Sequence, residues 1–176
     1  TEAITVSIND INEAPVITSV ATSSVNENLD ASSVVYTATA TDVDSSDTLT
    51  YSVSGTDAGL VAIDANNGQV TLNSSANFEA KSNYNFNVVA TDNGTGTLSG
   101  TKAITVNIND INDAPVVTSI TTPSVNENLD ASTVVYTVNA TDDDSDTLTY
   151  SLSGTDAALV SIDTDDGEVR LNTSAD

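Results

Sequence analysis

Two short acidic segments of this chain carry the residues best suited to chemistry, and they lie one hundred positions apart. Asp-Ile-Asn-Glu-Ala-Pro occupies residues 10–15, and Asp-Ile-Asn-Asp-Ala-Pro occupies residues 110–115. Their carboxylates and amides are hard oxygen ligands, and the chain contains neither His nor Cys. Oxygen clusters with several carboxylates suit Ca²⁺, which takes about six to eight oxygens at about 2.3–2.6 Å. The segments therefore indicate bound calcium rather than a thiolate metal site.

Each acidic segment also has a simpler structural interpretation. An Asp-rich loop in a β protein is commonly a solvated turn, and this is our interpretation of Asp64, Asp163 and the Asp-Asp-Gly sequence at residues 165–167. The linker at residues 110–115 would then be a polar hinge whose backbone is restrained by Pro115. The same spacing recurs with matching acids in distant loops, which favours metal ligands.

The charge balance excludes several classes of partner. Lys and Arg total 3 against 26 Asp and Glu, which gives a formal net charge of −23. A nucleic acid is excluded because few basic side chains are available to neutralise its phosphates, and anionic membrane surfaces are disfavoured for the same reason. No run approaches the roughly 18 apolar residues of a membrane span, so membrane insertion is not expected. Bound cations would relieve the mutual repulsion of the acids.

The acidic segments belong to a larger internal repeat. Residues 1–34 align with residues 101–134 without a gap, and the loop at residues 44–47 is one residue shorter in the second copy. The second copy contains no counterparts of residues 78–108. We expect this chain to be a piece of a longer array.

Three parts follow from this alignment. Residues 1–12 are predicted to be the last strand of a preceding repeat, residues 13–112 a complete repeat, and residues 113–176 a second repeat that is incomplete at its C-terminal end. Half a sandwich would expose unpaired strand edges. The sequence leaves open whether neighbouring chains complete the partial repeats.

Short β-branched runs separated by turn residues predict an all-β fold. Strands are expected at residues 16–25 (broken), 34–41, 48–54, 60–63, 70–73, 84–91 and 102–109. Asn-Asn-Gly at 66–68 and Asp-Asp-Gly at 165–167 mark hairpin turns, because these residues tolerate positive φ. Seven short strands in about 100 residues predict an Ig-like, Greek-key sandwich, repeated in tandem.

A sandwich of this kind gathers its loops at two ends. Glu27, the turn at residues 77–79 and the linker at residues 110–113 should share the end that faces the next repeat. The facing end of the second copy should carry the four aspartates at residues 142–146. Carboxylates gathered at such a junction repel one another unless a cation is bound.

Five motifs follow one another in a characteristic order along the chain. They are Val-Asn-Glu-Asn at residues 25–28, Asn-Phe-Glu-Ala at 77–80, Ala-Thr-Asp-Asn-Gly at 90–94, the linker at 110–115 and Ala-Thr-Asp-Asp-Asp at 140–144. This set resembles cadherin repeats, and most closely the cadherin-like repeats of large bacterial surface adhesins. The resemblance covers nearly the whole chain and implies calcium ions between successive repeats, which stiffen the array into a rod.

The resemblance and the gathering of loops together give a set of expected calcium ligands. At the central junction these are Glu27, Asn77, Glu79, Asp110, Asn112, Asp113, Asp142, Asp144 and Asp146. At the upstream junction they are Asp10, Asn12, Glu13, Asp42, Asp44 and Asp92, and Glu127 would begin a third junction.

Three positions depart from the family's pattern. Asn77 stands where the family usually has Asp, which would weaken one calcium site. The linker is one residue shorter than the common Asp-x-Asn-Asp-Asn-x-Pro form, which puts one carbonyl ligand in doubt. Glu13 replaces Asp upstream, and its longer side chain would shift the geometry of that site.

These features favour an extracellular calcium-binding repeat that stiffens a long surface or secreted adhesin and supports cell adhesion. Its partners would be neighbouring repeats of the same chain, with the adhesion ligand elsewhere in the parent protein. The alternative is a calcium-dependent carbohydrate- or ligand-binding module, which 2 Phe and no Trp disfavour. An enzyme is the weakest alternative, because no His or Cys is present as base or nucleophile, although a glycosidase pair of carboxylates stays conceivable.

Overall fold

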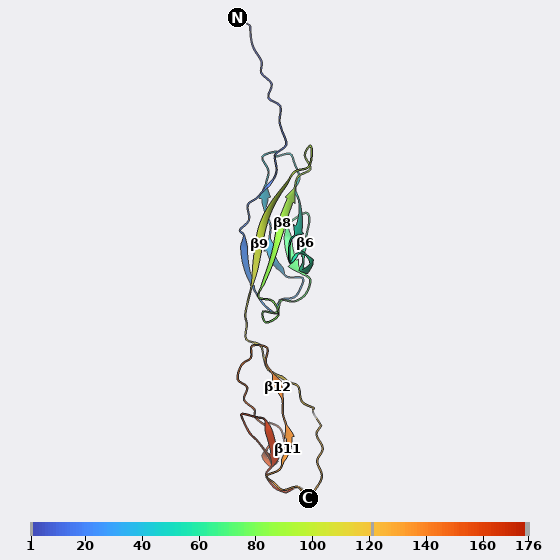
Figure 1. The fold of residues 1–176 in the computed structure, drawn as a ribbon, viewed down its shortest axis with the longest axis vertical. Helices are drawn as coiled ribbons and strands as arrows, with labels where there is room; N and C mark the ends of the chain where they lie inside the picture. Colours follow the sequence, from blue (N-terminus) through green and yellow to red (C-terminus); the bar gives the residue numbers. More distant parts are fainter. Residues whose placement is uncertain (1, 121, 175–176) are drawn as a thin grey trace. The chain divides into compact units, whose positions relative to one another are not determined.

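Figure 1 shows the fold in a computed structural model, which describes residues 2–120 and 122–174. The chain divides into two units, Thr1–Ile111 and Asn112–Asp176. The described helices are two 3₁₀ turns, η1 (Ala58–Leu60) and η2 (Ala157–Leu159). No helix among the described residues is long and apolar enough to cross a membrane. The predicted all-β class is confirmed.

The first unit is a sandwich of two main sheets. Its strands are β1 (Val16–Ile17), β2 (Thr22–Asn26), β3 (Val34–Thr37), β4 (Ala40–Thr41), β5 (Thr50–Ser54), β6 (Val61–Ile63), β7 (Gln69–Leu72), β8 (Asn83–Thr91) and β9 (Ser99–Asn109). One sheet has the order β2-β9-β8-β5, the other has the order β3-β7-β6, and β1 pairs with β4. These positions agree with the predicted strands.

Strand pairing decides which loops share an end of the sandwich. Every residue of β8 pairs antiparallel with β9, from Asn83↔Asn107 to Thr91↔Ser99, whereas β2 pairs with β9 in parallel, from Thr22↔Thr105 to Asn26↔Asn109. Because parallel strands finish at the same edge of a sheet, the residues that follow β2 and β9 meet there. This places Glu27 beside the start of the linker.

The core lies between the two sheets. Apolar side chains alternate with polar ones along β8 and β9, and the buried members are Tyr84, Phe86, Val88, Ala90, Ile104, Val106 and Ile108. From the opposite sheet, the Tyr36 ring meets Phe86 edge to face, with centroids 6.5 Å apart and planes at 79°. Full burial of a side chain such as Phe86, Val88 or Ile104 stabilises the fold by about 1.5–3 kcal/mol.

The second unit forms part of the same pattern. Its strands are β10 (Val116–Val117), β11 (Val134–Thr137), β12 (Ala140–Thr141), β13 (Val160–Ile162) and β14 (Glu168–Leu171). β10 pairs with β12, and β11, β14 and β13 form a three-stranded sheet. Gly68 (φ +70°) and Gly167 (φ +72°) close equivalent hairpins in the two units, as predicted.

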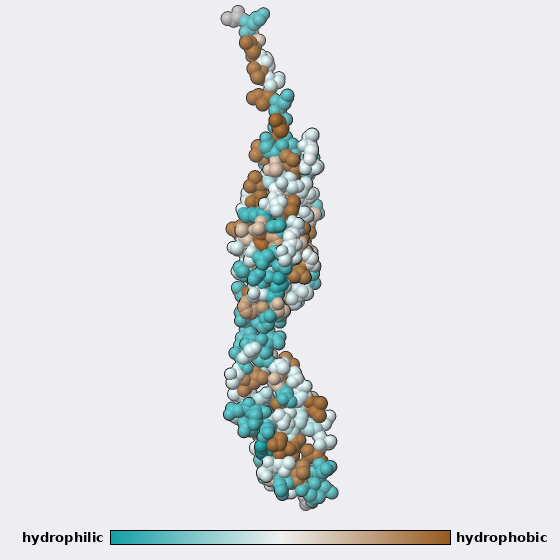
Figure 2. Space-filling view, viewed as in Figure 1, coloured by the Kyte–Doolittle hydropathy of each residue, from teal (hydrophilic) through white to brown (hydrophobic). Residues whose placement is uncertain are grey.

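The strand predicted within residues 1–10 is not formed in the described residues 2–10. Ile4, Val6 and Ile8 are 88, 79 and 93% exposed, and Figure 2 shows brown groups alternating with hydrophilic ones along this segment. The equivalent residues of β9 are at most 3% exposed. The difference has a physical cause: among the described residues, no strand pairs with residues 2–10 to satisfy their backbone groups or cover their apolar side chains.

Candidate metal centre

Three carboxylates converge at the end of the first unit where β2 and β9 finish. Glu27 follows β2, Asp110 follows β9, and Glu79 lies in the turn before β8. One carboxylate oxygen from each lies within 4.8 Å of the others. We call these three residues the Glu27 cluster. The structure therefore brings together three of the ligands predicted for the central junction.

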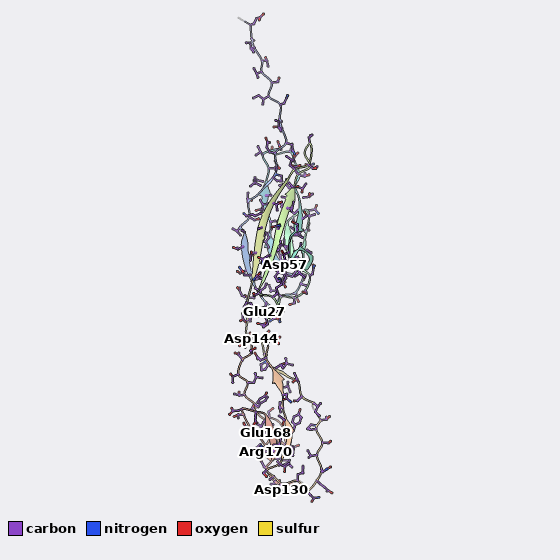
Figure 3. All side chains as sticks on the ribbon, viewed as in Figure 1. Glu27, Asp57, Asp130, Asp144, Glu168 and Arg170 are labelled. Carbon is purple, nitrogen blue, oxygen red and sulfur yellow. The ribbon has the colours of Figure 1, made fainter. Side chains whose placement is uncertain are left out.

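Glu27 is the buried member of this cluster, and its carboxylate is bonded to the backbone of two loops. Its side chain is only 3% exposed; Oε2 accepts a hydrogen bond from the backbone N–H of Phe78 (2.9 Å), and Oε1 accepts one from Ile111 (2.8 Å). Its own N–H donates to the carbonyl of Asn109 (3.1 Å). Figure 3 places Glu27 at the end of the sheet. Glu27 thus holds the two loops that carry Glu79 and Asp110.

Asn77 lies in the same loop, but its amide is used within the turn. Its Oδ1 accepts a hydrogen bond from the N–H of Ala80 (2.6 Å), and its carbonyl accepts one from Lys81 (3.0 Å). The Asn77 side chain therefore closes the turn through its oxygen, as an Asp at this position could also do.

A larger group of oxygens lies at the opposite end of the first unit. We call it the Asp92 cluster, and it comprises Asn12, Glu13, Asp42, Asp44, Asp47 and Asp92. Asp92 is 4% exposed. Its Oδ1 accepts hydrogen bonds from the backbone N–H groups of Gly94 (3.1 Å) and Leu98 (3.0 Å), and its Oδ2 accepts one from Nδ2 of Asn12 (3.1 Å). Asp10 lines the same pocket.

Backbone contacts also tie the linker to the loop that follows β4. The N–H of Glu13 donates to Oδ2 of Asp44 (2.9 Å), and the N–H of Asp44 donates to Oδ1 of Asp42 (2.9 Å). All six ligands predicted for the upstream junction thus lie around one pocket or in contact with its walls.

Desolvation and crowding of the acids in the Asp92 cluster raise the pKa values of two of them, Glu13 and Asp47. Desolvation raises the pKa of Glu13, and the carboxylates of Asp44, Asp10 and Asp42 raise it further. Desolvation likewise raises the pKa of Asp47, followed by the effects of Asp44, Asp92, Asp42 and Asp10. Both shifts favour the neutral acid, because like charges nearby disfavour ionisation.

Two carboxylate oxygens of this cluster lack a hydrogen-bond donor. Among the described side chains, Oδ2 of Asp42 and Oδ2 of Asp47 are buried without a hydrogen-bond partner. Unpaired buried oxygens are costly, and a hard cation supplies what such oxygens need. The donor set, which contains only oxygen, therefore fits calcium.

Asp47 is absent from the ligands predicted for the first unit, although its counterpart Asp146 was included in the second. The one-residue offset in this loop, applied to Asp146, identifies Asp47 directly. Gly94 completes the wall, since a Cβ added there would lie 1.9 Å from Oδ1 of Asn12 and 2.4 Å from Oδ2 of Asp47.

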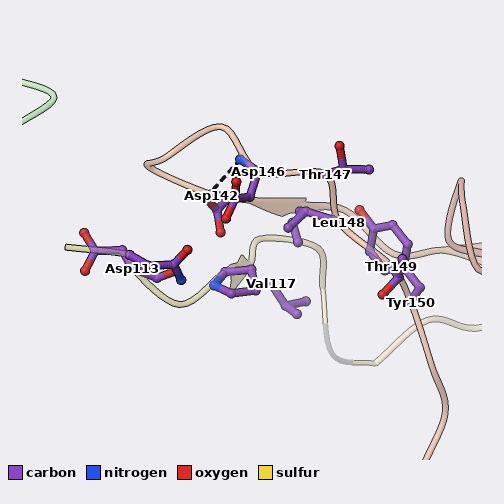
Figure 4. Close-up of a pocket in the computed structure, with 11 residues that line it drawn as sticks. Asp113, Val117, Asp142, Asp146, Thr147, Leu148, Thr149 and Tyr150 are labelled. Carbon is purple, nitrogen blue, oxygen red and sulfur yellow. Dashed lines mark hydrogen bonds between the residues drawn. The ribbon is translucent and has the colours of Figure 1, made fainter. Parts of the chain in front are cut away.

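The second unit carries an equivalent group, which we call the Asp142 cluster: Asn112, Asp113, Asp142, Asp144 and Asp146. The N–H of Asp113 donates to Oδ2 of Asp144, as Glu13 does to Asp44 in the first unit. The N–H of Asp146 donates to Oδ1 of Asp142 (3.2 Å), as drawn in Figure 4. Asn112, Asp113, Asp142 and Asp146 line a pocket of about 310 Å³.

Glu127 differs from its counterpart Glu27. Residues 24–32 and residues 124–132 have identical sequences. Glu127 is nevertheless exposed in the structure, whereas Glu27 is buried. The loops that hold Glu27 follow it by 51 and 84 residues. The sequence contains no equivalents of these loops after Glu127, so the predicted third junction stays a prediction.

Comparison with known proteins gives the family. A family model described as the cadherin domain matches residues 21–109. Protocadherin Fat 4 of Mus musculus is 34% identical over 145 residues, which make up 78% of this chain and 3% of that protein. This chain thus spans a small part of the length of such relatives. They are animal proteins, whereas the sequence suggested bacterial surface adhesins as the nearest likeness.

Solved structures agree with this result. Mouse cadherin-23 EC22-24 is similar with a TM-score of 0.57 and 30% identity, over 92% of this chain and 54% of that chain. Human protocadherin-24 EC1-2 is similar with a TM-score of 0.65 and 25% identity, over 94% of this chain and 80% of that chain. The sandwich, its strand order and these matches show that the chain belongs to the cadherin domain family, whose members are structural adhesion modules.

Proposed function

We propose that this chain is an extracellular calcium-binding spacer, in which tandem repeats stiffen a long surface or secreted adhesin. The observation that carries the proposal is the pair of buried oxygens, Oδ2 of Asp42 and Oδ2 of Asp47, without hydrogen-bond donors in a group of six acidic or amide residues. Cadherin domains generally bind calcium, which supports the same assignment.

In this proposal Asn12, Asp42, Asp44, Asp47 and Asp92 hold calcium at one end of the first unit. Glu27, Glu79 and Asp110 hold it at the other end. Two like charges about 4 Å apart repel by roughly 4 kcal/mol at an effective dielectric of about 20. The cation supplies the opposite charge, which converts this repulsion into attraction and orders the loops.

The mechanical effect follows from the position of the ligands in the sequence. Asp110 belongs to the Glu27 cluster, and Asn112 and Asp113 belong to the Asp142 cluster, so the two clusters are separated by one residue of linker. Calcium at both clusters would restrain the linker at each end. Chelation would release it, and the array would become flexible.

The parent protein and its setting are part of the same proposal. We retain repeats at residues 13–112 and 113–176, with residues 1–12 belonging to a preceding repeat. Extracellular modules bind calcium with dissociation constants of about 10⁻⁴–10⁻³ M, which matches calcium levels outside cells. The parent would be a long surface or secreted adhesin, with its adhesion ligand elsewhere.

Thermal unfolding in millimolar calcium, excess chelator and millimolar magnesium tests the proposal. A ligand that binds only the folded state at about 100 times its dissociation constant stabilises it by about 2.7 kcal/mol, so calcium should raise the Tm clearly. Asp113→Ala should lower the calcium affinity, whereas Asp64→Asn, a change in a hairpin turn, should not. No shift with calcium would mean that the acidic loops are solvated turns.

A further inference from the structure

The chain contains two Asn-Gly sequences, at residues 67–68 and 93–94. An asparagine before glycine is especially prone to deamidation, because no Cβ on the glycine obstructs attack of its backbone nitrogen on the asparagine side chain. The second copy has Asp-Gly at residues 166–167 in place of the first pair, so an acid is accepted in that hairpin turn. Asn93 and Gly94 instead line the pocket of the Asp92 cluster, where a chemical change would affect the proposed ligands.

The loop that carries Asn93 joins β8 to β9. β8 ends at Thr91 and β9 begins at Ser99, so neither Asn93 nor Gly94 belongs to a strand. The Asn93 side chain is exposed, and Gly94 is half-buried. Water therefore reaches Asn93, and its side chain can rotate toward Gly94 without displacing the core.

Two hydrogen bonds at this position favour the reaction. The N–H of Thr48 donates to Oδ1 of Asn93 (2.7 Å), the oxygen on which negative charge develops when Cγ is attacked. The N–H of Gly94 donates to Oδ1 of Asp92 (3.1 Å), so a carboxylate contacts the proton that must leave the attacking nitrogen. A donor for the developing charge and a base thus lie on either side of the reacting atoms.

The pair at residues 67–68 lacks this arrangement. Gly68 is buried, and its N–H donates to the backbone carbonyl of Asp64 (2.9 Å) rather than to a carboxylate. The Asn67 amide is held at both ends, since Nδ2 donates to Oδ2 of Asp64 (3.0 Å) and Oδ1 accepts the N–H of Gln69 (2.9 Å). Ring closure there would break these bonds and move Gly68, where an added Cβ would lie 2.4 Å from the carbonyl oxygen of Ala38.

We propose that Asn93-Gly94 is a site of spontaneous deamidation in the folded protein. The nitrogen of Gly94 attacks Cγ of Asn93 and gives its proton to the carboxylate of Asp92. The bond from Cγ to the amide nitrogen then breaks, and the amide leaves as ammonia with that proton. Water opens the resulting succinimide ring at either carbonyl, which leaves aspartate or isoaspartate at position 93.

The isoaspartate product would disturb the Asp92 cluster, and this consequence rests on the proposed calcium binding. It lengthens the backbone by one carbon atom directly before Gly94. The N–H of Gly94 holds Asp92, and an atom added at its Cα would meet side-chain oxygens of Asn12 and Asp47. Calcium affinity should therefore fall as the protein ages, and deamidation would limit the working life of this site.

Peptide mapping of the whole chain, aged in chelator at neutral pH, tests the inference. The 3 Lys and Arg residues place Asn67 and Asn93 on different tryptic peptides, residues 1–81 and 82–102. Mass spectrometry follows the conversion of each amide to an acid, and enzymatic methylation of isoaspartate identifies the product. We expect Asn93 to react at least about tenfold faster than Asn67 in the folded protein, because a base in contact commonly contributes more than this. In urea the two rates should be similar, since the fold no longer distinguishes them.

Two variants separate the chemistry from the loop. Asn93→Gln is the matched control, because its longer side chain would have to close a larger ring, and it should abolish conversion at position 93. Asp92→Asn keeps a hydrogen-bond acceptor but removes the base, and it should slow the reaction at Asn93 by about tenfold. Melting in chelator checks that both variants fold, and the comparison of Asn67 with Asn93 in the unaltered chain needs neither. Equal rates at these two residues in the folded protein, or an unchanged rate in Asp92→Asn, would overturn the inference.

The same samples separate this inference from the proposed function. The rates in chelator decide whether Asn93 is a deamidation site, whether or not calcium binds. Calcium titration of fresh and aged protein then measures the effect on the cluster, with weaker binding expected after ageing and no such change in Asn93→Gln. Equal affinities of the fresh and aged protein would overturn that effect. Absence of calcium binding by the fresh protein would contradict the proposed function and leave the deamidation site standing.

Discussion

Oε2 of Glu27 accepts a hydrogen bond from the backbone N–H of Phe78 at 2.9 Å, across 51 residues of sequence. The other oxygen accepts the N–H of Ile111. One buried carboxylate therefore joins the end of β2 to the turn before β8 and to the linker after β9. Structural support and the proposed metal binding meet in this residue, and substitutions can separate the two.

Glu27→Ala should destabilise the first unit in the absence of calcium. It removes the acceptor from the N–H groups of Phe78 and Ile111, both of which make part-buried hydrogen bonds, so the penalty should be about 1 kcal/mol for each. Urea unfolding in chelator measures the loss. Glu127→Ala is the matched control, because it removes an exposed glutamate from the same local sequence and should change stability by less than about 0.5 kcal/mol. Equal effects would mean that the contacts of Glu27 do not stabilise the unit.

Asp47→Asn should have opposite effects with and without calcium. In chelator it removes a carboxylate whose pKa is raised by desolvation and by Asp44, so the variant should melt at a higher temperature than the unaltered chain. In calcium it removes a ligand, so affinity should fall. Melting curves in both buffers and a calcium titration measure these effects. A lower Tm of the variant in chelator would show that the charge of Asp47 is not repelled.

The raised pKa values of Glu13 and Asp47 also predict a pH effect in chelator. An acid whose folded-state pKa is raised destabilises the fold fully above that pKa, and the penalty disappears as pH falls to the unfolded value, about 3.9 for Asp. Asp47→Asn should therefore lose part of its advantage in Tm as the pH falls. An advantage that stays constant to pH 4 would contradict this mechanism.

Gly94→Ala should weaken calcium binding while leaving the fold nearly intact. The added Cβ would meet Oδ1 of Asn12 at 1.9 Å and Oδ2 of Asp47 at 2.4 Å, and both are the ends of side chains that can move aside. The ligands would be displaced, with little cost to the core. Gly59→Ala is the control, because no atom lies within 4 Å of its added Cβ. Calcium titration with melting in chelator distinguishes the two effects.

Asp57→Asn should show that the contacts of Asp57, which lie away from the proposed metal clusters, stabilise the fold in a pH-dependent way. The N–H of Asn85 donates to Oδ2 of Asp57 (2.7 Å), and this bond, with Lys81 at 3.1 Å, lowers the pKa of Asp57 despite desolvation. An acid with a lowered folded-state pKa stabilises the fold above its unfolded value, about 3.9, and this is lost as pH falls through the folded value. The stability difference between the two proteins should therefore be constant from pH 7 to about pH 5 and shrink below about pH 4.

Asp156→Asn is the matched control for that experiment. Asp156 is the counterpart of Asp57 in the second unit and is exposed. Its substitution should leave the acid part of the stability curve unchanged. A similar change in both variants would assign the effect to general charge rather than to the contacts of Asp57 with Asn85 and Lys81.

The sequence by itself determined the local features of this protein. The alternation along β8 and β9, the hairpins at Gly68 and Gly167, and the recurrence of acids at fixed offsets all follow from short segments. Such features depend on side-chain periodicity and on which residues tolerate positive φ, so they need no distant partner.

Only the tertiary structure decided which of these segments become strands and sites. Ile104 is 2% exposed within β9, whereas Ile4, in a nearly identical segment, is 88% exposed. Glu27 is buried between two loops, and Glu127 is exposed although its neighbours in sequence are the same. A strand needs a partner for its backbone groups, and a buried carboxylate needs donors from distant loops. Those partners are supplied by the fold.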